Sequence, residues 1–412
     1  VSKSSKTRQD REARPCATIF NTAAAFVPRL VGGSGWKAVI ECVKIFCKGG
    51  KHMRRHYLDN LRWATVLLVV FYHVIYMYNG VITAGVVGPF APVQPQDAVQ
   101  YLLYPWFMVL LFVVSGASAR LALERQPPKA FAVRRTEKLL VPSTLGLLVF
   151  QWVLGGFNMA LAGAFDTLPP LPAPVLWLIM AASGCGVLWF AQMLWLFSMA
   201  LVLLRRFERG RLYRVCGRLG PLALAALGLP LWAAAQVLNA PYIAVYRFGI
   251  YAFAFLLGYF VFAQEEVVER LAAHPLPFCA AALALGTAYA LRWFGQNYAA
   301  PPAVNCPLAI AFAWATVLAA FAAMKRWGDR TGPLAAWLGQ RSFGLYVLHY
   351  LPLAAAAWAM DRFLHLPAGV CYLLAAAAAF GGGYGLNALI SKTPVLRWCV
   401  LGKRKEKRHV SG

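Results

Sequence analysis

The sequence predicts an all-α, polytopic integral membrane protein with about ten transmembrane helices. Hydrophobic residues make up 60% of the 412 residues and charged residues 13%, about half the charged fraction of a typical soluble domain. Apolar runs of roughly 20 residues, long enough to cross a bilayer as helices, recur along the chain. Helices are expected because a lipid-exposed span must satisfy its backbone polar groups internally.

The first expected span follows an Arg-rich entrance, and nine more follow it with short breaks between them. The ten spans are expected at 61–79, 98–119, 139–160, 185–204, 220–236, 246–263, 276–292, 306–324, 342–359 and 370–390. Gly and Pro are frequent inside and beside these runs, as is common in transmembrane helices. An even number of spans places both termini on one side of the membrane.

Lys and Arg are distributed asymmetrically between the two sets of loops. Neither 80–97 nor 161–184 contains a Lys or an Arg. The loops of the other set carry basic groups at Arg54–Arg55, Arg120–Lys138, Arg205–Arg214 and Lys325–Arg330, and in the tail from Lys403. The positive-inside rule therefore predicts cytoplasmic termini in a multi-pass protein of the cell (plasma) membrane. The net charge of +25 therefore comes largely from loops at the cytoplasmic surface of the membrane, where Lys and Arg are attracted to anionic lipid. Nucleic acid is not an expected partner.

The first 52 residues differ in character from the remainder, since they mix basic, small polar and weakly amphipathic stretches. We expect residues 1–52 to be dispensable or to lie upstream of the true start, and 53–402 to form the membrane domain. Residues 403–412 form a basic cytoplasmic tail. The nine cysteines show no C-x-x-C spacing and no His–Cys cluster, so neither a disulfide framework nor a metal site is expected.

The first span carries an ionisable side chain at its entrance and another in its middle. Arg62 and His73 are eleven residues apart, which returns to within roughly 20° of the same helix face. The helical rise places His73 roughly 16 Å deeper than Arg62, near the centre of the bilayer. Ionisable groups at that depth are costly and normally serve a function. The bland alternative is a hydrogen-bonded structural histidine with an interfacial, snorkelling arginine.

The entrance to the third span is basic. Lys138 follows Arg135 by three residues and Arg134 by four. On a regular helix these three cations would form one ledge that can hold phosphates at the membrane boundary. Taken alone, the same cluster is also explained by ordinary positive-inside charge.

A second deep imidazole occurs in the ninth span. Tyr346 and His349 are three residues apart and share a helix face, which would place a hydroxyl beside the imidazole. The alternative is that His349 bonds a backbone carbonyl opened by Pro352. In the second span, Ser115 and Gly116 are interpreted as small residues that let helices approach closely rather than as a nucleophile.

These motifs together resemble the acyltransferase-3 family. The resemblance rests on the entrance R-x-x-x-L-D-N-L-R from Arg54, the R-x10-H spacing from Arg62 to His73, F-x-x-S-G in the second span and R-x-x-K-x-x-x-P from Arg135. It covers roughly 53–402. Within the family, the opening and the C-terminal VLRWCVLGKRK are similar to the glucan biosynthesis protein C branch, the periplasmic glucan succinyltransferases.

The resemblance implies a ten-span membrane enzyme that passes acyl groups to sugars. It implies an acyl-CoA donor, acetyl-CoA or succinyl-CoA, arriving from the cytoplasm, and a saccharide acceptor of the cell envelope or for export. His73 and Arg62 match the family's essential first-span pair, and Arg134 and Arg135 its basic motif. Lys138 departs from the pattern, because a second spaced Arg is common there and Lys cannot bind phosphate bidentately.

We therefore expect an acyltransferase in which His73, Arg62, His349 and Tyr346 serve catalysis and Arg134, Arg135 and Lys138 bind the donor. The alternative is a proton-coupled transporter of an acylated or anionic solute, with His73 and His349 as a relay. A transporter would favour an internal repeat of spans, and the sequence shows none.

Overall fold

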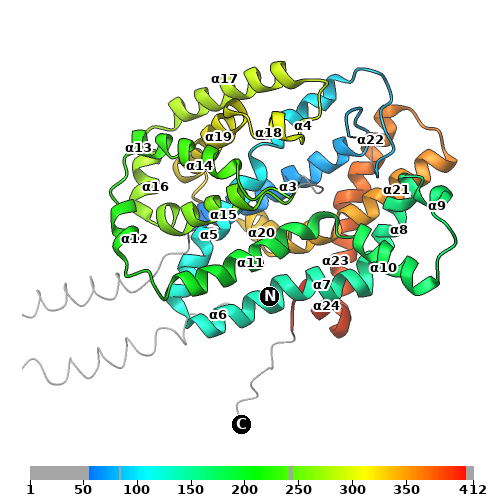
Figure 1. The fold of residues 1–412 in the computed structure, drawn as a ribbon, viewed down its shortest axis with the longest axis horizontal. Coiled ribbons are helices and arrows are strands. Elements are labelled where there is room, and N and C mark those ends of the chain that lie inside the picture. The colour runs from blue at the N-terminus through cyan, green and yellow to red at the C-terminus, as the bar shows by residue number, and fades with distance from the viewer. Residues whose placement is uncertain (1–54, 83–84, 241–244, 405–412) are drawn as a thin grey trace, which may run out of the picture. The chain divides into compact units, whose positions relative to one another are not determined.

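The computed structural model describes residues 55–82, 85–240 and 245–404, and this part of the chain is helical (Figure 1). Within it, the one pairing of extended backbone is an isolated bridge between Asn239 and Arg247. The predicted all-α class is thus confirmed. The expected N-terminal segment 1–52 and residues 405–412 of the expected tail lie outside the described residues.

The first half of the chain contains long helices interrupted by short turns. In chain order the elements are α3 (His56–Tyr76), η2 (Pro95–Asp97), α4 (Ala98–Leu103), α5 (Phe107–Arg125), α6 (Pro128–Arg135), η3 (Thr136–Leu140), α7 (Val141–Gly146), η4 (Leu147–Gln151), α8 (Trp152–Leu161), α9 (Ala164–Thr167), α10 (Ala173–Ser183), η5 (Gly186–Leu188) and α11 (Trp189–Leu204). The segments η3 and η4 are π-helical turns inside one long third span.

The second half continues the bundle. Its elements are α12 (Arg211–Cys216), α13 (Pro221–Ala226), α14 (Gly228–Ala235), α15 (Phe248–Leu257), η6 (Gly258–Phe262), α16 (Glu265–Ala272), α17 (Pro275–Trp293), α18 (Pro301–Val304), α19 (Pro307–Trp327), α20 (Pro333–Leu348), α21 (Tyr350–Phe363), α22 (Ala368–Ala377), η7 (Ala378–Gly382), α23 (Gly383–Lys392) and α24 (Pro394–Leu401). Proline stands in the first turn of α6, α17, α19, α20 and α24, where its missing N–H leaves no helical bond unmade.

Seven helices of the described chain are long and apolar enough to cross a membrane, and nine are if two bent pairs each count as one span. The bent pairs are α15–η6 with α16, at 92°, and α20 with α21, at 51°. The run predicted at 220–236 is the shorter apolar helix Pro221–Ala235. The multi-span membrane fold is confirmed, whereas the number ten and the orientation of the termini stay predictions.

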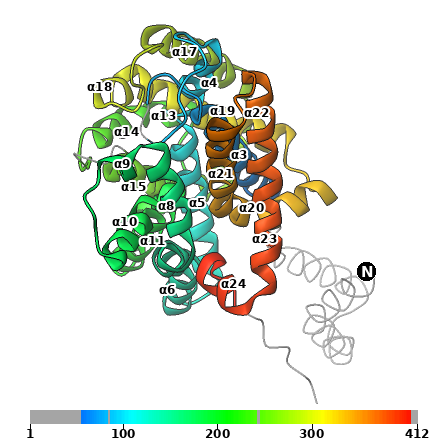
Figure 2. The same cartoon turned by 90° about the vertical axis from the view of Figure 1, so that its right-hand side faces the viewer.

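Helix α3 lies inside the bundle and contacts α4, α5, α19 and α20. Figure 2 shows α5 on one side of it and the helix formed by α22 and α23 on the other. Eleven of its residues are buried, among them Tyr57, Val70 and Tyr72. This packing explains how a helix can carry His73 deep in the bundle, because protein rather than lipid surrounds the side chain.

Glycines allow two pairs of helices to touch backbone to backbone. A Cβ added at Gly116 of α5 would lie 1.9 Å from the carbonyl oxygen of Phe255, and one at Gly258 would lie 2.0 Å from that of Val113. A similar contact joins α8 and α10, where a Cβ at Gly155 would lie 1.6 Å from the carbonyl oxygen of Met180. The close-packing role predicted for Gly116 is confirmed.

Candidate active site

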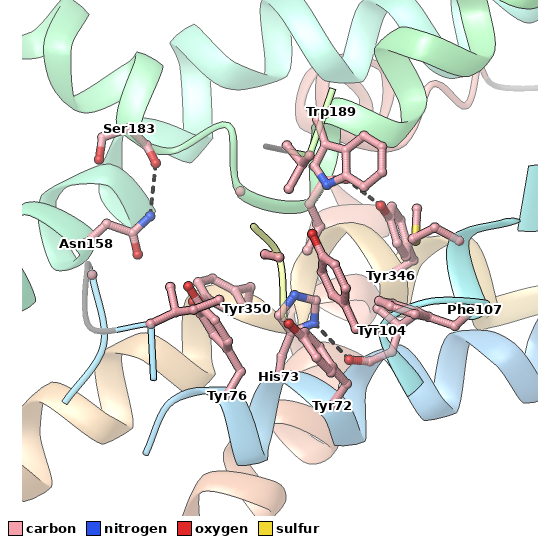
Figure 3. Close-up of a pocket in the computed structure, with 18 of the residues that line it drawn as sticks. Tyr72, His73, Tyr76, Tyr104, Phe107, Asn158, Ser183, Trp189, Tyr346 and Tyr350 are labelled. Atoms are coloured by element: carbon pink, nitrogen blue, oxygen red, sulfur yellow. Dashed lines mark hydrogen bonds between the residues drawn. The ribbon is translucent and has the colours of Figure 1, made fainter. Parts of the chain in front are cut away.

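A cavity of about 570 Å³ lies beside the C-terminal half of α3. Residues from 80–97 and 161–184, the loops without Lys or Arg, form part of its wall. The wall is rich in aromatic side chains (Figure 3), which are those of Tyr72, Tyr76, Tyr104, Phe107, Trp189, Tyr251, Tyr346 and Tyr350. Among the described residues that line it there is one imidazole, that of His73, and no Lys, Arg, Asp or Glu. The cavity therefore suits an uncharged, ring-shaped or polyhydroxylated ligand.

His73 contributes one ring nitrogen to a hydrogen bond with its own helix. Its Nδ1 lies 2.8 Å from the carbonyl oxygen of Val69, one turn earlier. Figure 3 shows the ring in the cavity wall, with the other nitrogen on the side of the cavity. Tyr72 and Tyr350 stand edge-on to the ring, with centroids 5.2 and 5.0 Å away, so the imidazole is held in one orientation.

A second imidazole lies behind the first. His349 Nε2 is 3.2 Å from His73 Nδ1, although the two residues are 276 positions apart in the sequence. His349 is fully buried and is not part of the cavity wall. The structure thus brings together the two deep histidines that the sequence singled out. Of the two, only His73 lines the cavity.

The surrounding carbonyls determine where the protons of the two neutral rings sit. His349 Nδ1 lies 3.0 Å from the carbonyl oxygen of Leu345 and 2.9 Å from that of Tyr346. Carbonyl oxygens only accept, so this nitrogen carries the hydrogen and Nε2 is left as an acceptor. His73 Nδ1 faces the Val69 carbonyl and that acceptor, so it must donate. The remaining nitrogen, His73 Nε2, keeps its lone pair for the cavity.

The break between α20 and α21 places His349. The helix stops at Leu348, bends by 51° and resumes at Tyr350, two residues before Pro352. The imidazole bonds the carbonyls of Leu345 and Tyr346 in the preceding turn. The carbonyl that Pro352 leaves without a helical donor is that of Leu348, so a structural role is present, but not through the carbonyl that the sequence-based alternative named. Pro352 disrupts the regular ladder at this point, which explains the location of the bend.

Tyr346 lines the cavity, but its hydroxyl does not bond His349. The hydroxyl donates to the carbonyl oxygen of Val187, in the short η5 turn before α11. Its ring stands edge-on to Phe190, with centroids 5.7 Å apart. Tyr346 therefore links the η5 turn to α20, and its hydroxyl hydrogen is used within the protein.

Arg62 stands near the other end of α3 and is not part of the cavity wall. Its guanidinium lies 3.2 Å from Asp59 Oδ1 and donates to Ser118 Oγ at 2.7 Å. The eleven-residue spacing corresponds to a rise of roughly 16 Å. The structure therefore separates Arg62 from His73, as the depth argument predicts, and a shared substrate would have to extend between them.

Arg62 belongs instead to a group of cations at that end. Its charge repels those of both Arg135 and Lys138. Arg135 lies over the ring of Phe131, 5.0 Å from its centroid, and Lys138 Nζ lies 5.6 Å from that of Phe343. Lys138 stands in the π-helical turn η3, and such turns are frequent at functional sites.

Arg134, like Lys138, is exposed, and the structure shows no hydrogen bond or ion pair for it among the described residues. The π-helical turn that follows Arg135 departs from the regular helical spacing on which the expected ledge rests. A single ledge formed by all three cations therefore stays a prediction.

Sequence reasoning missed a buried network that begins at the cavity. Tyr72 and Tyr298 have their hydroxyls 3.0 Å apart, Tyr298 donates to Gln100 Oε1 at 2.5 Å, and Gln100 Nε2 lies 3.3 Å from Asp97 Oδ1. Burial raises the pKa of the Tyr298 hydroxyl well above its ordinary value, so it stays protonated. Because it gives its hydrogen to Gln100, Tyr72 must donate to Tyr298. The available signal was Asp97, the one acidic residue in 80–97.

A second overlooked polar group is Asn158 of α8. Its side-chain nitrogen donates to the carbonyl oxygen of Ser183 at 2.9 Å, and both residues line the cavity (Figure 3). Its Oδ1 is buried without a hydrogen-bond partner. Buried polar atoms are normally paired, so this acceptor is a candidate contact for a ligand hydroxyl.

The comparisons with known proteins agree with this geometry. The family model Acyl_transf_3, described as an acyltransferase domain, matches residues 55–391. The chain belongs to the acyltransferase-3 family. This acyltransferase-3 chain matches no curated protein and no solved structure in the other two comparisons. Membership makes the protein a membrane acyltransferase, and the matched region contains the cavity, both histidines and the third-span basic group.

Proposed function

We propose that this acyltransferase-3 protein moves an acyl group, acetyl or succinyl, from cytoplasmic acyl-CoA to a hydroxyl of a cell-envelope or exported saccharide. The observation that carries the proposal is the place of His73 in the wall of the cavity, with Nδ1 near the Val69 carbonyl and His349 Nε2, which leaves Nε2 of His73 for a ligand. A neutral imidazole in this state can remove a proton from a hydroxyl.

The chemistry of the cavity supports a sugar as the acceptor. Aromatic faces stack on the apolar faces of sugar rings, and several polar atoms of the wall can only accept or have already used their hydrogen. Tyr72 and Tyr346 donate to protein groups, and Asn158 Oδ1 is unpaired. These oxygen atoms can accept hydrogen bonds from a ligand, and sugar hydroxyls can donate them. The absence of cations from the described wall argues against an anionic acceptor group at this position.

In the proposed reaction, His73 Nε2 takes the proton of the acceptor hydroxyl while the oxygen attacks the thioester carbonyl. The C–O bond forms, the C–S bond breaks, and the CoA sulfur takes the proton from Nε2, so the imidazole ends as it began. A variant route has Nε2 attack the thioester first and pass the acyl group to the hydroxyl. Both routes need the same unprotonated nitrogen.

The donor would bind with its phosphates at the group around Arg62. Arg135 and Lys138 lie close enough to Arg62 for their charges to interact, and phosphates are stabilised by such groups of cations. The neutral pantetheine arm would then extend along α3 toward His73. Arg134, exposed beside them, would attract the donor without a fixed contact.

Transfer from labelled acetyl-CoA or succinyl-CoA to glucan oligosaccharides, in proteoliposomes containing the full chain, tests this proposal. We expect labelled oligosaccharide from the native protein and none from His73→Ala. His274→Ala, which removes an exposed histidine before α17, is the matched control and should behave as the native protein. Mass spectrometry of envelope glycans from cells with and without the protein would then identify the acyl group and the acceptor.

The transporter alternative gains no support from the structure. The contact between His73 and His349 would suit a proton relay, but His349 is sealed from the cavity and bonded to carbonyls of its own helix. Uptake of labelled acyl-CoA or sugar without acylation, by liposomes containing the protein, would favour transport instead.

A further inference from the structure

The C-terminal helix α24 returns to the third span. Gly402 ends α24 with a φ of +60°, and a Cβ there would lie 2.3 Å from the carbonyl oxygen of Glu137 and 2.7 Å from the Cα of Lys138. The next residue but one, Arg404, forms an ion pair with Glu137, its Nη2 3.1 Å from Oε1. The chain therefore passes directly over η3, and Lys403 is placed beside Lys138.

Lys403 links two groups of cations. The positive charge of Lys403 repels that of Lys138, which is also repelled by the charges of Arg62 and Arg135. Helix α24, which ends at Leu401, contacts α7 of the third span and also α20, the helix that carries Arg341. These contacts place Lys403 near both the third span and α20, and partial burial, followed by repulsion from Arg341 and Arg397, lowers the pKa of Lys403.

Carboxylates do not balance these cations. Asp59 pairs with Arg62, and Glu137 pairs with Arg404. Within the described part of the chain, Arg135, Lys138, Lys403 and Arg341 form no ion pair with an acidic side chain. Arg341 lies over the ring of Trp337, 4.8 Å from its centroid, which leaves its edge available for hydrogen bonds. A group of like charges from α6, η3, α20 and the chain just after α24 favours a polyanionic ligand.

We infer that Lys403 and Arg341 form a second phosphate subsite, which takes the phosphate monoester at the adenosine end of the donor, the 3′-phosphate of CoA. This inference rests on the proposed function, which places the diphosphate of CoA at Arg62, Arg135 and Lys138 with the pantetheine arm toward His73. The adenosine end must then lie beyond these cations, and Lys403, beside Lys138, and Arg341, on a helix in contact with α24, are available to bind its phosphate. Phospholipid headgroups offer the same phosphate chemistry, so the test must separate the two sources.

The test compares binding of CoA and 3′-dephospho-CoA to the full chain in nanodiscs of zwitterionic lipid, by calorimetry. The native protein should bind CoA about tenfold more tightly, since one charge-assisted phosphate contact is worth about that factor. Lys403→Gln and Arg341→Gln should weaken CoA to the level of 3′-dephospho-CoA and leave the latter unchanged. Lys129→Gln, which removes an exposed cation of α6, is the charge-matched control and should keep the native preference.

The outcomes are separable. Equal binding of both ligands by the native protein, or a preference that survives both substitutions, would overturn the subsite. If the variants lose binding to anionic-lipid vesicles and keep the CoA preference, the cations serve headgroups and the inference is wrong. Failure of the native protein to bind CoA in any form would instead refute the proposed donor.

Discussion

His349 Nε2 lies 3.2 Å from His73 Nδ1, so a buried imidazole beside a helix break shares, with the Val69 carbonyl oxygen at 2.8 Å, the hydrogen of the imidazole that faces the cavity. In this arrangement the two histidines have different functional roles. His73 is the group that can touch a substrate, and His349 is a positioning residue that fixes the tautomer of its neighbour.

His73→Ala should abolish acyl transfer, with a loss of at least about a hundredfold in kcat, because the base or acyl carrier is removed. The level of inserted protein should stay near normal, since no charge is left unpaired. The measurement is labelled product per unit of inserted protein. If activity stays within a few-fold of native, His73 is a packing residue.

His349→Ala should lower kcat by about ten- to a hundredfold, as loss of an orienting partner commonly does, and leave the acceptor KM unchanged. His349→Gln should retain more activity, because its amide can accept from His73 Nδ1 and donate to a carbonyl. Steady-state kinetics of both variants, with their thermal stability measured in parallel, distinguish positioning from folding. Equal losses in the two variants, each with a lowered melting temperature, would assign His349 to the helix break alone.

Trp189→Ala should raise the KM for the saccharide acceptor severalfold while leaving the KM for acyl-CoA unchanged, because the indole lines the cavity and not the basic end. Trp327→Ala, at an indole 54% exposed outside the cavity, is the control. A change in the donor KM instead would show that the cavity holds the donor.

Gly116→Ala should destabilise the protein by about 1–3 kcal/mol, since the added methyl would lie 1.9 Å from the carbonyl oxygen of Phe255. Gly385→Ala makes the same chemical change in α23, where nothing lies within 4 Å, and should stabilise by about 0.5–1 kcal/mol. Thermal unfolding of the two purified variants gives the comparison. Equal shifts would mean that α5 and α15 are not in contact as described.

The orientation can be tested with single cysteines at Val93 and Phe207, which are 70% and 80% exposed, in a background without the native cysteines. The charge asymmetry predicts that an impermeant maleimide added outside cells modifies position 93 and spares position 207. The reverse pattern would invert the donor side and contradict the proposed route from cytoplasmic CoA.

Much of the fold was predictable because membrane helices can be recognised in a sequence as long apolar runs. Periodicity cannot reveal bends, so the break at His349 and the 92° turn before α16 were missed. The apolar helix α10 was also missed, since at 11 residues it is too short to read as a span and fell within an expected loop.

The residues of the candidate site could be singled out from the sequence, whereas their contacts with one another could not. Depth in a span marks His73 and His349 as unusual, because buried ionisable groups are costly. Their contact joins positions 276 apart, which no local pattern encodes. The hydrogen-bonded network from Tyr72 to Asp97 was not predicted for the same reason. Each of its members is an ordinary polar residue in the sequence, and only the packing of the helices brings them together.

The separation of the cations from the cavity has an electrical consequence. If the phosphates of the donor stay at Arg62, Arg135 and Lys138, only the neutral pantetheine arm and the acyl group reach the depth of His73. Transfer of an acetyl group would then move no net charge through the bilayer, whereas a succinyl carboxylate would carry one, worth about 2.3 kcal/mol per 100 mV. Acetylation should thus be indifferent to the membrane potential, and succinylation should be aided by a negative interior.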